Sequence, residues 1–524
     1  MKKKLHTKKI VIAFLVFLSS NSFAQIEFQK YYSPFAQGNS IEQTFDGGYV
    51  IAGSEQNFGA GGNDVYLIKT NNFGDTLWTK TFGGVSDDYG MSVKQTADSG
   101  FIIAGITSSF GAGSTDVYLI RTDSIGNMLW SKTYGRTYYD NAYCVIQSID
   151  GGFVVAGYSN NSSNPNSEDF YLIKTNNNGD TLWTKIIGGI NAYNDRANAV
   201  QQTNDGGYII IGYTYSFGVG VDMYVVKTDS SGRPSWSKTY GGINADLGFD
   251  IRQTTDGGYI LTGRSYSFSA TSFNDVYLVK TDSAGNELWS KTYGGGGHDF
   301  GYTVRQTTDA GYIIGGRTDS LGVNFKQIYL IKTNSTGNLQ WSRTFGAAGG
   351  ELGNAAIQAN DGGYIITGAG NGSIYLIKTD SAGNSGCYES SAATIETQVA
   401  TQVTSPSSAF NTPATIVTSP NTIVNGGGTT TDLCTNVGTV EINPSSFKIS
   451  PNPSSGNFII SFEGTIITGS VEVINIFGEK VFAENIFTET KKEIHIKNIL
   501  NGIYFVKMFD GEKYSCRKLI IEHH

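Results

Sequence analysis

Short hydrophobic runs separated by glycine-containing turns fill most of the chain. In one stretch, four such runs follow each other at residues 90–96, 100–105, 116–122 and 128–134. They are rich in β-branched and aromatic residues, which favour strands, whereas Asp, Ser and Gly between them favour turns. A short apolar run can also belong to a buried helix, but the glycines at its ends favour a strand. The pattern therefore predicts four consecutive β-strands in this stretch.

The same four-strand unit repeats along the chain. A turn of the form Asp-Gly-Gly-aromatic, or a close variant, recurs at steps of 51 to 55 residues. The third strand of each unit carries a tyrosine, and all six tryptophans occupy one position of the fourth strand. A period of about 52 residues with several strands per unit indicates a β-propeller rather than a thin solenoid. The turns start at Asp46, Asp98, Asp150, Asp205, Asp256, Asp309 and Asp361.

The phase of the repeat shows how the ring should close. The seventh unit ends after its third strand and lacks a tryptophan strand. Before the first turn, Phe28-Gln-Lys-Tyr-Tyr32 resembles the Trp-Ser-Lys-Thr-Tyr pattern of the fourth strands. We therefore predict that the start of the chain completes the last blade, which leaves no unpaired inner edge. Residues 25–386 are expected to form an all-β, seven-bladed β-propeller with four-stranded blades.

The repeats also resemble a known family. The unit that begins Asp275-Val-Tyr-Leu-Val-Lys-Thr and continues through Trp289-Ser-Lys-Thr-Tyr-Gly-Gly is similar to bacterial β-propeller repeats of the SBBP type. The resemblance covers roughly residues 26–385. It implies a fold and does not imply an activity.

The N-terminal segment has the features of an export signal. Five lysines precede a short apolar run at residues 10–18, and Ser22-Phe23-Ala24 offers small residues before a cleavage point. The apolar run is far shorter than the ~20 residues of a membrane span. We predict a cleaved signal peptide at residues 1–24 and no membrane span; a hydrophobic N-terminal helix of the folded protein is the alternative.

The charge of the chain limits the kinds of molecule that it can bind. Charged residues make up 16% of the chain, and its formal net charge is −8, which becomes −13 once the five lysines of the signal are removed. Disordered chains, coiled coils and nucleic-acid binders all need many charges. An acidic protein is also a poor partner for nucleic acid or anionic lipid. We expect a secreted protein, free outside the cell or attached to its outer surface, that binds no nucleic acid.

Residues 387–442 differ in composition from the repeats. Ser, Thr, Val and Ala dominate, with three prolines, and the sequence Val-Thr-Ser-Pro occurs twice, 14 residues apart. Such a composition predicts an extended spacer without a core of its own. Cys387 and Cys434 bracket the spacer, and in an oxidising exterior they could form a disulfide. Four cysteines permit three pairings, and Cys144 fits equally well as a free buried thiol.

The C-terminal residues 443–524 resemble the sorting domain of type IX secretion in Bacteroidetes. The match lies in Ile449-Ser-Pro-Asn-Pro-Ser-Ser-Gly456, Val471-Glu-Val-Ile-Asn-Ile-Phe-Gly478, Leu500-Asn-Gly-Ile-Tyr504 and Lys518-Leu-Ile-Ile521. The resemblance implies export by the type IX machinery and an Ig-like β-sandwich; an ordinary Ig-like adhesion module is the alternative. The motif residues are Pro451, Asn452, Pro453, Gly456, Gly478, Gly502, Tyr504 and Lys518.

Few residues suggest catalysis. The chain has five histidines, and His298 alone lies in the repeats, in a glycine-rich loop where a solvated side chain is expected. One histidine argues against Ser-His-Asp catalysis and against a zinc site built from several histidines. Phosphate-loop, zinc-protease and EF-hand patterns do not occur. We therefore predict no catalytic residues, no metal and no cofactor.

One acidic position recurs in register. An acid lies seven residues before the Gln of the first strand in six units, and Ala36 takes this place in the seventh. These acids could surround one mouth of the channel and bind a cation or a polar ligand; alternatively they accept backbone N–H bonds in turns. A seven-bladed ring is too wide for six carboxylates to reach one calcium ion. The acids are Asp88, Asp140, Asp195, Asp246, Asp299 and Glu351.

Loops between the second and third strands vary and carry aromatic residues. Aromatic rings beside Asn and Ser suit sugars, although for each single residue packing against a neighbouring blade is the simpler explanation. We expect a non-catalytic binding or adhesion module whose ligand is a glycan or a surface protein. A polysaccharide-degrading enzyme that uses the mouth acids, or a structural surface-layer component, is the alternative. The aromatics are Phe58, Phe110, Tyr213, Tyr215, Phe217, Tyr266, Phe268 and Phe273.

Overall fold

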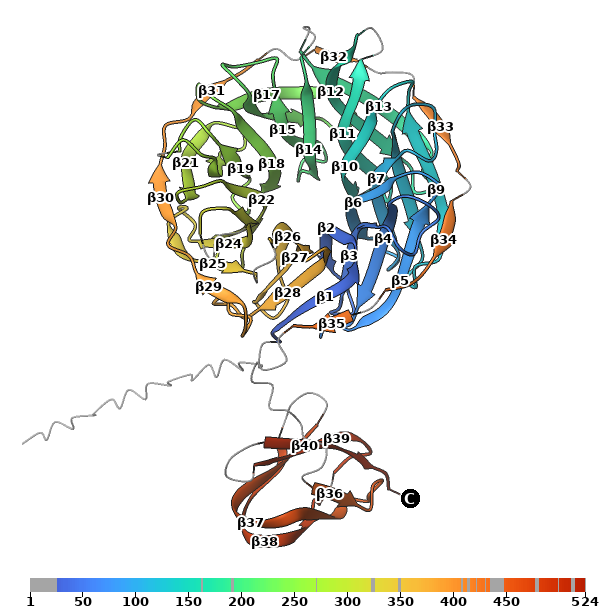
Figure 1. Ribbon diagram of the computed structural model, residues 1–524, viewed down its shortest axis with the longest axis vertical. Coiled ribbons are helices and arrows are strands. Elements are labelled where there is room, and N and C mark those ends of the chain that lie inside the picture. The colour runs from blue at the N-terminus through green and yellow to red at the C-terminus, as the bar shows by residue number, and fades with distance from the viewer. Residues whose placement is uncertain are drawn as a thin grey trace, which may run out of the picture. The chain divides into compact units, whose positions relative to one another are not determined.

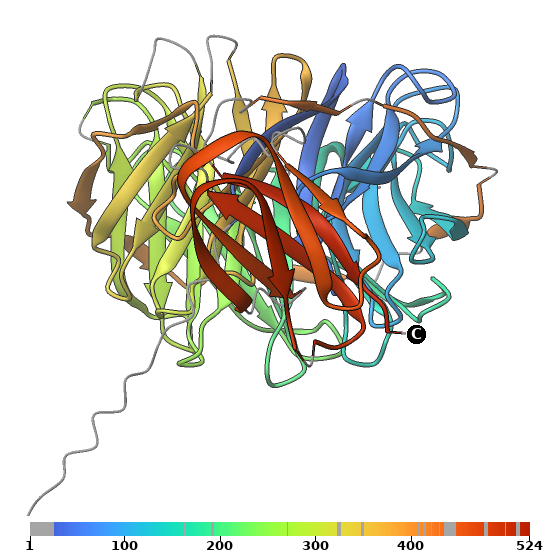
Figure 2. The same ribbon diagram turned by 90° about the horizontal axis from the view of Figure 1, so that it is seen from below.

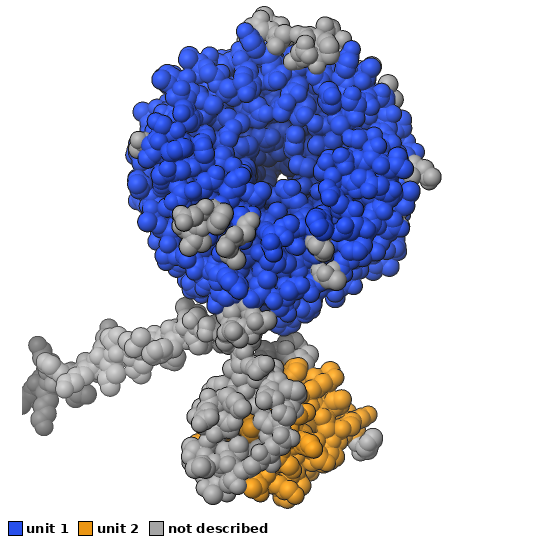
Figure 3. Space-filling model, in the orientation of Figure 1, with its two compact units in different colours: residues 1–434 blue, residues 435–524 orange. Residues whose placement is uncertain are grey.

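The computed structural model divides into two compact units, residues 1–434 and 435–524 (Figure 3). Every element of its described residues is a β-strand. The predicted signal peptide and Cys434 lie outside the described residues. Those described are 26–161, 164–189, 193–269, 271–321, 326–346, 350–406, 409–411, 415–420, 422–428, 430–433, 447–475, 480–497, 499–509 and 514–523.

Four antiparallel strands in chain order form each repeat of the first unit. In the unit analysed above they are β6 (Asp88–Gln95), β7 (Phe101–Thr107), β8 (Asp116–Thr122) and β9 (Met128–Gly135). Within its described residues, this part of the chain contains seven such sheets. Figure 1 shows them arranged radially in a ring, and Figure 2 shows their strands running between its two faces.

The other sheets follow the same order from the centre outward. They are β2 (Ala36–Gln43), β3 (Tyr49–Glu55), β4 (Asp64–Thr70), β5 (Thr76–Gly83); β10 (Asp140–Gln147), β11 (Phe153–Asn161), β12 (Asn164–Thr175), β13 (Thr181–Gly188); β14 (Asp195–Gln202), β15 (Tyr208–Thr214), β16 (Asp222–Thr228), β17 (Pro234–Gly241); β18 (Asp246–Gln253), β19 (Tyr259–Ser265), β20 (Asp275–Thr281), β21 (Glu287–Gly294); β22 (Asp299–Gln306), β23 (Tyr312–Thr318), β24 (Gln327–Thr333), β25 (Leu339–Phe345); and β26 (Leu352–Gln358), β27 (Tyr364–Gly370), β28 (Ser373–Thr379).

The hydrophobic core lies between neighbouring sheets. All seven residues of β8 are buried, because both faces of this strand are covered. One core cluster joins Val50 and Leu67 of one sheet to Phe101 and Tyr118 of the next. Strands buried on both faces need near-continuous apolar runs, which is what the repeats contain.

The chain closes the ring as its sequence predicts. The strand β1 (Phe28–Pro34) pairs antiparallel with β28, and Tyr31 lies opposite Tyr375. Each innermost strand contacts the innermost strand of the next sheet, and β2 contacts β26. The N-terminal segment thus supplies the outer strand missing from the last repeat, as expected.

The spacer is not free, and this corrects the sequence expectation. Its short strands each pair antiparallel with the outermost strand of one sheet, so every sheet has five strands instead of the predicted four (Figure 1). We call residues 387–433 the belt. Its strands are β29 (Glu389–Ser391), β30 (Ile395–Gln398), β31 (Gln402–Thr404), β32 (Ala409–Asn411), β33 (Ile416–Thr418), β34 (Ile423–Asn425) and β35 (Thr430–Asp432), on β25, β21, β17, β13, β9, β5 and β1 in turn.

A seven-residue spacing fits the belt to the ring. Belt threonines seven or fourteen residues apart hydrogen-bond to the tyrosine hydroxyls of successive third strands. These tyrosines are the repeated residues of the sequence pattern, and their hydroxyls would otherwise be costly to bury. The pairs are Thr394–Tyr329, Thr401–Tyr277, Thr415–Tyr171 and Thr422–Tyr118.

The second unit is a separate β-fold. Its strands are β36 (Phe447–Ser450), β37 (Asn457–Asn475), β38 (Lys480–His495), β39 (Gly502–Phe509) and β40 (Tyr514–Ile521), and β37 pairs with β36, β38 and β39. Asn452 fastens the start of this unit to its last strand, because its side chain accepts from Ile520 N and donates to Lys518 O, both at 2.8 Å. Gly478 lies outside the described residues.

Two of the remaining motif residues also have structural roles. Gly456 has a φ of 97°, in the left-handed region that favours glycine, and the Tyr504 hydroxyl donates to the carbonyl of Leu500 at 3.0 Å. The motif of this unit therefore fixes its turns and its strand ends.

Cysteine chemistry is partly as expected. Cys144 is free and buried in β10. Cys387, at the start of the belt, is disulfide-bonded. Its pairing with Cys434 stays a prediction.

Candidate functional site

The registered acids lie at the ends of the innermost strands, but they are buried. Asp88 begins β6 and is 0% exposed. Its Oδ2 accepts hydrogen bonds from the Gly84 backbone N–H at 2.8 Å and from the Ser109 hydroxyl at 2.7 Å. Four other registered acids accept the equivalent hydrogen bond from a backbone N–H: Asp140 from Arg136, Asp195 from Gly189, Asp246 from Gly242 and Asp299 from Gly295. Glu351, just before β26, is also 0% exposed.

A second acid lies beside five of these carboxylates. Asp64, which begins β4, and Asp88 both pack against Gly83, so a side chain there would overlap both. Burial, and secondarily the charge of its neighbour Asp88, raises the pKa of Asp64 to about 6. The acid pairs, as we call them, are Asp64–Asp88, Asp116–Asp140, Asp169–Asp195, Asp222–Asp246 and Asp275–Asp299.

This geometry favours the structural interpretation of the acids. Their oxygens hold the loops that lead into each innermost strand, within a sheet rather than around the open channel. No group of three or more His, Cys, Asp or Glu placed to hold a metal occurs in the described part of the chain. A ligand-binding role for the registered acids stays a prediction.

A different group of side chains flanks the acids at positions where the repeats differ. Arg196 follows Asp195, Phe300 follows Asp299, and the cross-strand partners at this level are Tyr213 and Arg317. At most positions of the repeat the same kind of residue occurs in sheet after sheet. At these positions the residue varies from sheet to sheet. We call the group the mouth cluster: Tyr158, Glu168, Arg196, Tyr213, Arg264, Phe300, Tyr302 and Arg317, from four neighbouring sheets.

One arginine of the cluster is fully paired. Arg196 makes a two-pronged ion pair with Glu168, and its Nη2 lies 2.9 Å from Glu168 Oε1. Its guanidinium lies over the ring of Tyr158, 4.5 Å from the ring centroid. Hydrogen bonding to Glu168 offsets desolvation and raises the pKa of Arg196. Arg196 is thus held rigidly, with its charge neutralised.

Two further arginines share an aromatic ring. The guanidiniums of Arg264 and Arg317 lie over Phe300, 5.1 Å and 4.3 Å from its centroid. Phe300 is nearly parallel to Tyr302, with centroids 6.0 Å apart. Burial lowers the pKa of Arg264, because desolvation disfavours its charge. Cation–π contacts of this kind hold a guanidinium in place without neutralising it.

The phenols of the cluster stay protonated at neutral pH. Burial raises the pKa of Tyr158, Tyr213 and Tyr302 above the usual value of 10. These side chains can therefore donate hydrogen bonds, but they are poor general bases.

The predicted loop aromatics divide into two groups. Phe110, Phe217 and Phe268 pack on Tyr118, Tyr224 and Tyr277, with centroids 5.4 to 5.8 Å apart, and so support the blades. Phe58 packs against Gly427 of the belt. By contrast, Tyr213 belongs to the mouth cluster, Tyr215 is 50% exposed beside it, and Tyr266 and Phe273 are each 39% exposed.

His298 is not the solvated loop residue that we expected. It is half-buried, its Nδ1 accepts from the Asn274 backbone N–H at 3.2 Å, and its ring packs edge-on against Phe273. The ring also approaches Phe300, with centroids 6.1 Å apart. It borders the mouth cluster.

Sequence reasoning identified Tyr213 and Tyr215 but gave no role to Arg264 and Arg317. One available signal was the residue after each registered acid, which varies among the repeats: Gln37, Tyr89, Asn141, Arg196, Leu247, Phe300 and Leu352.

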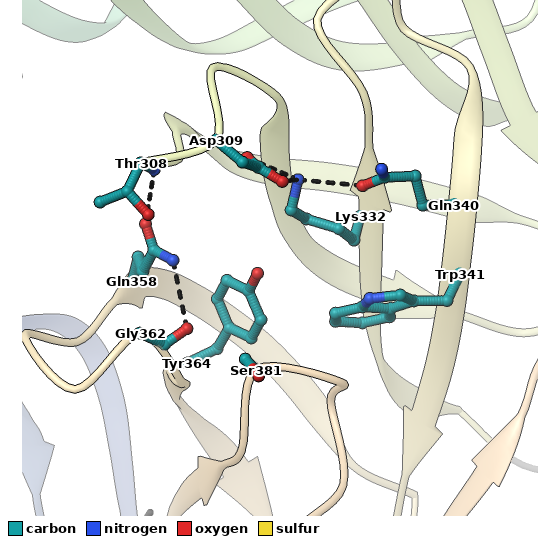
Figure 4. A pocket seen from close by; sticks show the side chains of 9 residues that line it. All are labelled: Thr308, Asp309, Lys332, Gln340, Trp341, Gln358, Gly362, Tyr364 and Ser381. Atoms are coloured by element: carbon teal, nitrogen blue, oxygen red, sulfur yellow. Dashed lines mark hydrogen bonds and ion pairs between the residues drawn. The ribbon is translucent and has the colours of Figure 1, made fainter. Parts of the chain in front are cut away.

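A pocket of about 420 Å³ lies at the other end of the strands (Figure 4). Lys332 pairs with Asp309 at 2.8 Å and with Gln340 at 3.1 Å, while Trp341 packs edge-on against Tyr364. The Lys–Asp contact recurs within other sheets, and the Trp–aromatic contact recurs between them. We therefore interpret this pocket as part of the architecture.

Comparison with known families covers the C-terminal unit. Residues 448–522 match the family described as the secretion system C-terminal sorting domain. The match confirms the sorting-domain resemblance and indicates export by the type IX machinery, with attachment to the cell surface or release outside the cell. No curated protein matches the chain. The resemblance to SBBP-type repeats stays a prediction.

Solved structures with similar folds are distant. Sqt1 from Chaetomium thermophilum is 10% identical, with 68% of this chain and 99% of that chain covered and a TM-score of 0.38. An endo-1,5-alpha-L-arabinanase from Thermotoga petrophila is 10% identical, with 68% and 100% covered and a TM-score of 0.28. The mannose phosphorylase MPT-4 from Leishmania mexicana is 10% identical, with 44% and 81% covered and a TM-score of 0.25. TM-scores below 0.5 say nothing about ligand or activity.

A search for membrane-spanning helices gave none among the described residues.

Proposed function

We propose that residues 26–433 form a closed seven-bladed β-propeller that acts outside the cell as a non-catalytic binding or adhesion module. The seven sheets, the contact between β2 and β26 and the pairing of β1 with β28 support closure. The sorting domain is proposed to fold as an Ig-like sandwich, with a core to which all five of its strands, β36 to β40, contribute buried residues.

The mouth cluster is the main observation that supports this proposal. Six of the seven repeats share their Trp, and all seven carry a Lys or Arg in the third strand and a similar turn, which serve the architecture. Aromatic and arginine side chains at positions that vary among the repeats meet at one end of four sheets. Variable residues on a rigid scaffold are where recognition usually lies. Aromatic faces beside hydroxyl and guanidinium donors suit a glycan.

The geometry favours binding over the enzymatic alternative. Polysaccharide hydrolysis needs two carboxyl groups that face a shared substrate, whereas the acid pairs are buried beneath loops. The phenols at the mouth are protonated and cannot serve as bases at neutral pH.

The test is a glycan array probed with residues 25–524. Selective binding that is lost in Tyr215→Ala and kept in Phe45→Ala would support the proposal; Phe45 is also an exposed aromatic, in a turn at the other end of the strands. Release of shorter saccharides from any arrayed glycan would support the enzyme instead. Absence of both binding and products would overturn the proposal and favour a structural surface component.

A further inference from the structure

The arginines of the mouth cluster differ in how their charge is balanced. Arg196 is neutralised by Glu168. The Nε atom of Arg317 lies 3.9 Å from Oδ1 of Asp319, near the upper distance limit of an ion pair. Arg264 makes no ion pair or hydrogen bond within the described residues, and the charge of Arg317 disfavours its own. The mouth therefore carries cationic charge that the protein itself does not balance.

Burial makes this arrangement costly. The Nε atoms of Arg264 and Arg317 are both buried and have no hydrogen-bond partner within the described residues. A buried donor without a partner loses its bonds to water and gains nothing in return. The two guanidiniums both contact Phe300, and the charge of Arg317 disfavours that of Arg264. An anion bound to the guanidiniums would offset this repulsion.

The surroundings define the anion further. Tyr302 stacks with Phe300, and Tyr213 and Tyr215 lie near Arg264. Burial raises the pKa of Tyr213, so its phenol stays protonated at neutral pH. Such a site offers ring faces and neutral donors around a forked cation. This combination fits a ring that carries an acidic group better than it fits a small free anion.

We propose that Arg264 and Arg317 bind the carboxylate or sulfate group of an acidic polysaccharide, with the sugar ring against the aromatic side chains of the mouth cluster. This inference rests on the proposed binding function and names its ligand class. A guanidinium fork matches a carboxylate or sulfate through parallel hydrogen bonds, and a charged acceptor strengthens each bond.

A nucleic acid fits the site less well. Binding to a phosphate backbone depends on many cationic contacts along the chain, whereas this protein has a net charge of −8 and gathers few cations at the mouth. A single acidic group held among aromatic rings needs only a local cationic site.

The experiment measures binding of residues 25–524 to matched polymers. The carboxylate probe is polygalacturonate and its control is the fully methyl-esterified polymer, which has the same backbone without charge. The sulfate probe is a sulfated galactan and its control is the desulfated galactan. Single-stranded DNA tests the nucleic-acid alternative at the same ionic strength.

We expect one acidic polymer to bind and its uncharged control to bind at least tenfold more weakly. Arg264→Gln and Arg317→Gln should each weaken binding by roughly 10- to 100-fold, because each removes a charged hydrogen bond. Arg233→Gln, which removes an exposed arginine in the turn between β16 and β17, should leave affinity unchanged. If an arginine variant fails to fold, melting of the unchanged protein still reports binding, since a ligand of the folded state raises Tm.

Equal binding of the charged and uncharged polymers, or equal loss in Arg233→Gln and Arg264→Gln, would overturn this inference and leave the proposed function standing. Stronger binding to DNA than to either acidic polymer would also overturn it. If no carbohydrate of any kind binds, the proposed function fails as well.

Discussion

The side chains of Tyr171 and Thr415 are 244 residues apart in sequence, yet their hydroxyl oxygens lie 2.6 Å apart. Tyr171 belongs to a third strand and is 1% exposed, and Thr415 belongs to the belt. The same contact recurs between other sheets and other belt threonines. The belt therefore ties the sheets together from outside and covers the outer edge strands.

Removing the belt hydroxyls should lower stability in proportion to their number. In Thr415→Val the Tyr171 hydroxyl stays buried without its partner, so the free energy of unfolding should fall by about 1–2 kcal/mol. Urea unfolding at neutral pH measures this. Thr397→Val, an exposed β30 residue, is the matched control and should change stability little. Equal effects of the two substitutions would contradict the tyrosine contact.

The disulfide of Cys387 should fasten the belt. If its partner is Cys434, the bond closes a loop of about 48 residues and contributes roughly 4 kcal/mol in the chain-entropy model. Cys387→Ser and Cys434→Ser should then lower the free energy of unfolding equally, and the double variant should be no worse than either. Peptide mapping without reductant identifies the pair. A Cys434→Ser variant as stable as the unchanged protein would show that Cys387 has another partner.

The acid pairs should make the protein more stable at mildly acidic pH than at alkaline pH. Burial, the largest cause, and the charge of Asp246 raise the pKa of Asp222 to about 7, against 3.8 for an unperturbed Asp. Because the folded-state pKa is the higher one, this stabilisation is fully present below pH 3.8 and is lost as pH rises through about 7. The free energy of unfolding should fall between pH 5 and pH 8 by on the order of 1 kcal/mol per pair.

Asp222→Asn tests the assignment, since the amide resembles the protonated acid. This variant should show a smaller loss between pH 5 and pH 8 than the unchanged protein does. Asp282→Asn is the control, because Asp282 lies in an exposed turn where hydrogen bonds hold its pKa below the usual value despite some desolvation. An unchanged pH dependence in Asp222→Asn would refute the prediction.

The repeats could be predicted from the sequence because their signals are local. The Asp-Gly-Gly turns and the apolar runs identify consecutive strands, and the missing tryptophan strand after Tyr375 led correctly to the pairing of β1 with β28. The registered acids were also found, but their partners were not. Asp64 and Asp88 belong to different sheets, and only folding brings them to the same glycine.

The belt was mistaken for a free spacer because it lacks the usual strand pattern. Its strands are three or four residues long and contribute little to any core. The signal was the spacing: Val403-Thr-Ser-Pro406 and Val417-Thr-Ser-Pro420 lie 14 residues apart, which is two belt steps of seven. A seven-residue step can be recognised as the spacing between neighbouring sheets only once the geometry of the ring is known. Arg264 and Arg317 of the mouth cluster were missed because their position varies: they share one position of the second strand, which carries other residues in the other five sheets.

The glycine between each acid pair should be intolerant of any side chain. At Gly241 a Cβ would lie 1.9 Å from Asp222 Oδ1 and 2.9 Å from Asp246 Oδ2, and both acids are buried. The carboxyl groups cannot move away without breaking the bond from Gly242 N to Asp246, so Gly241→Ala should cost about 1–3 kcal/mol or more. Gly296→Ala is the control, since a Cβ there meets nothing within 4 Å. Urea unfolding distinguishes them, and equal stability of the two variants would show that the acid pair is not packed as described.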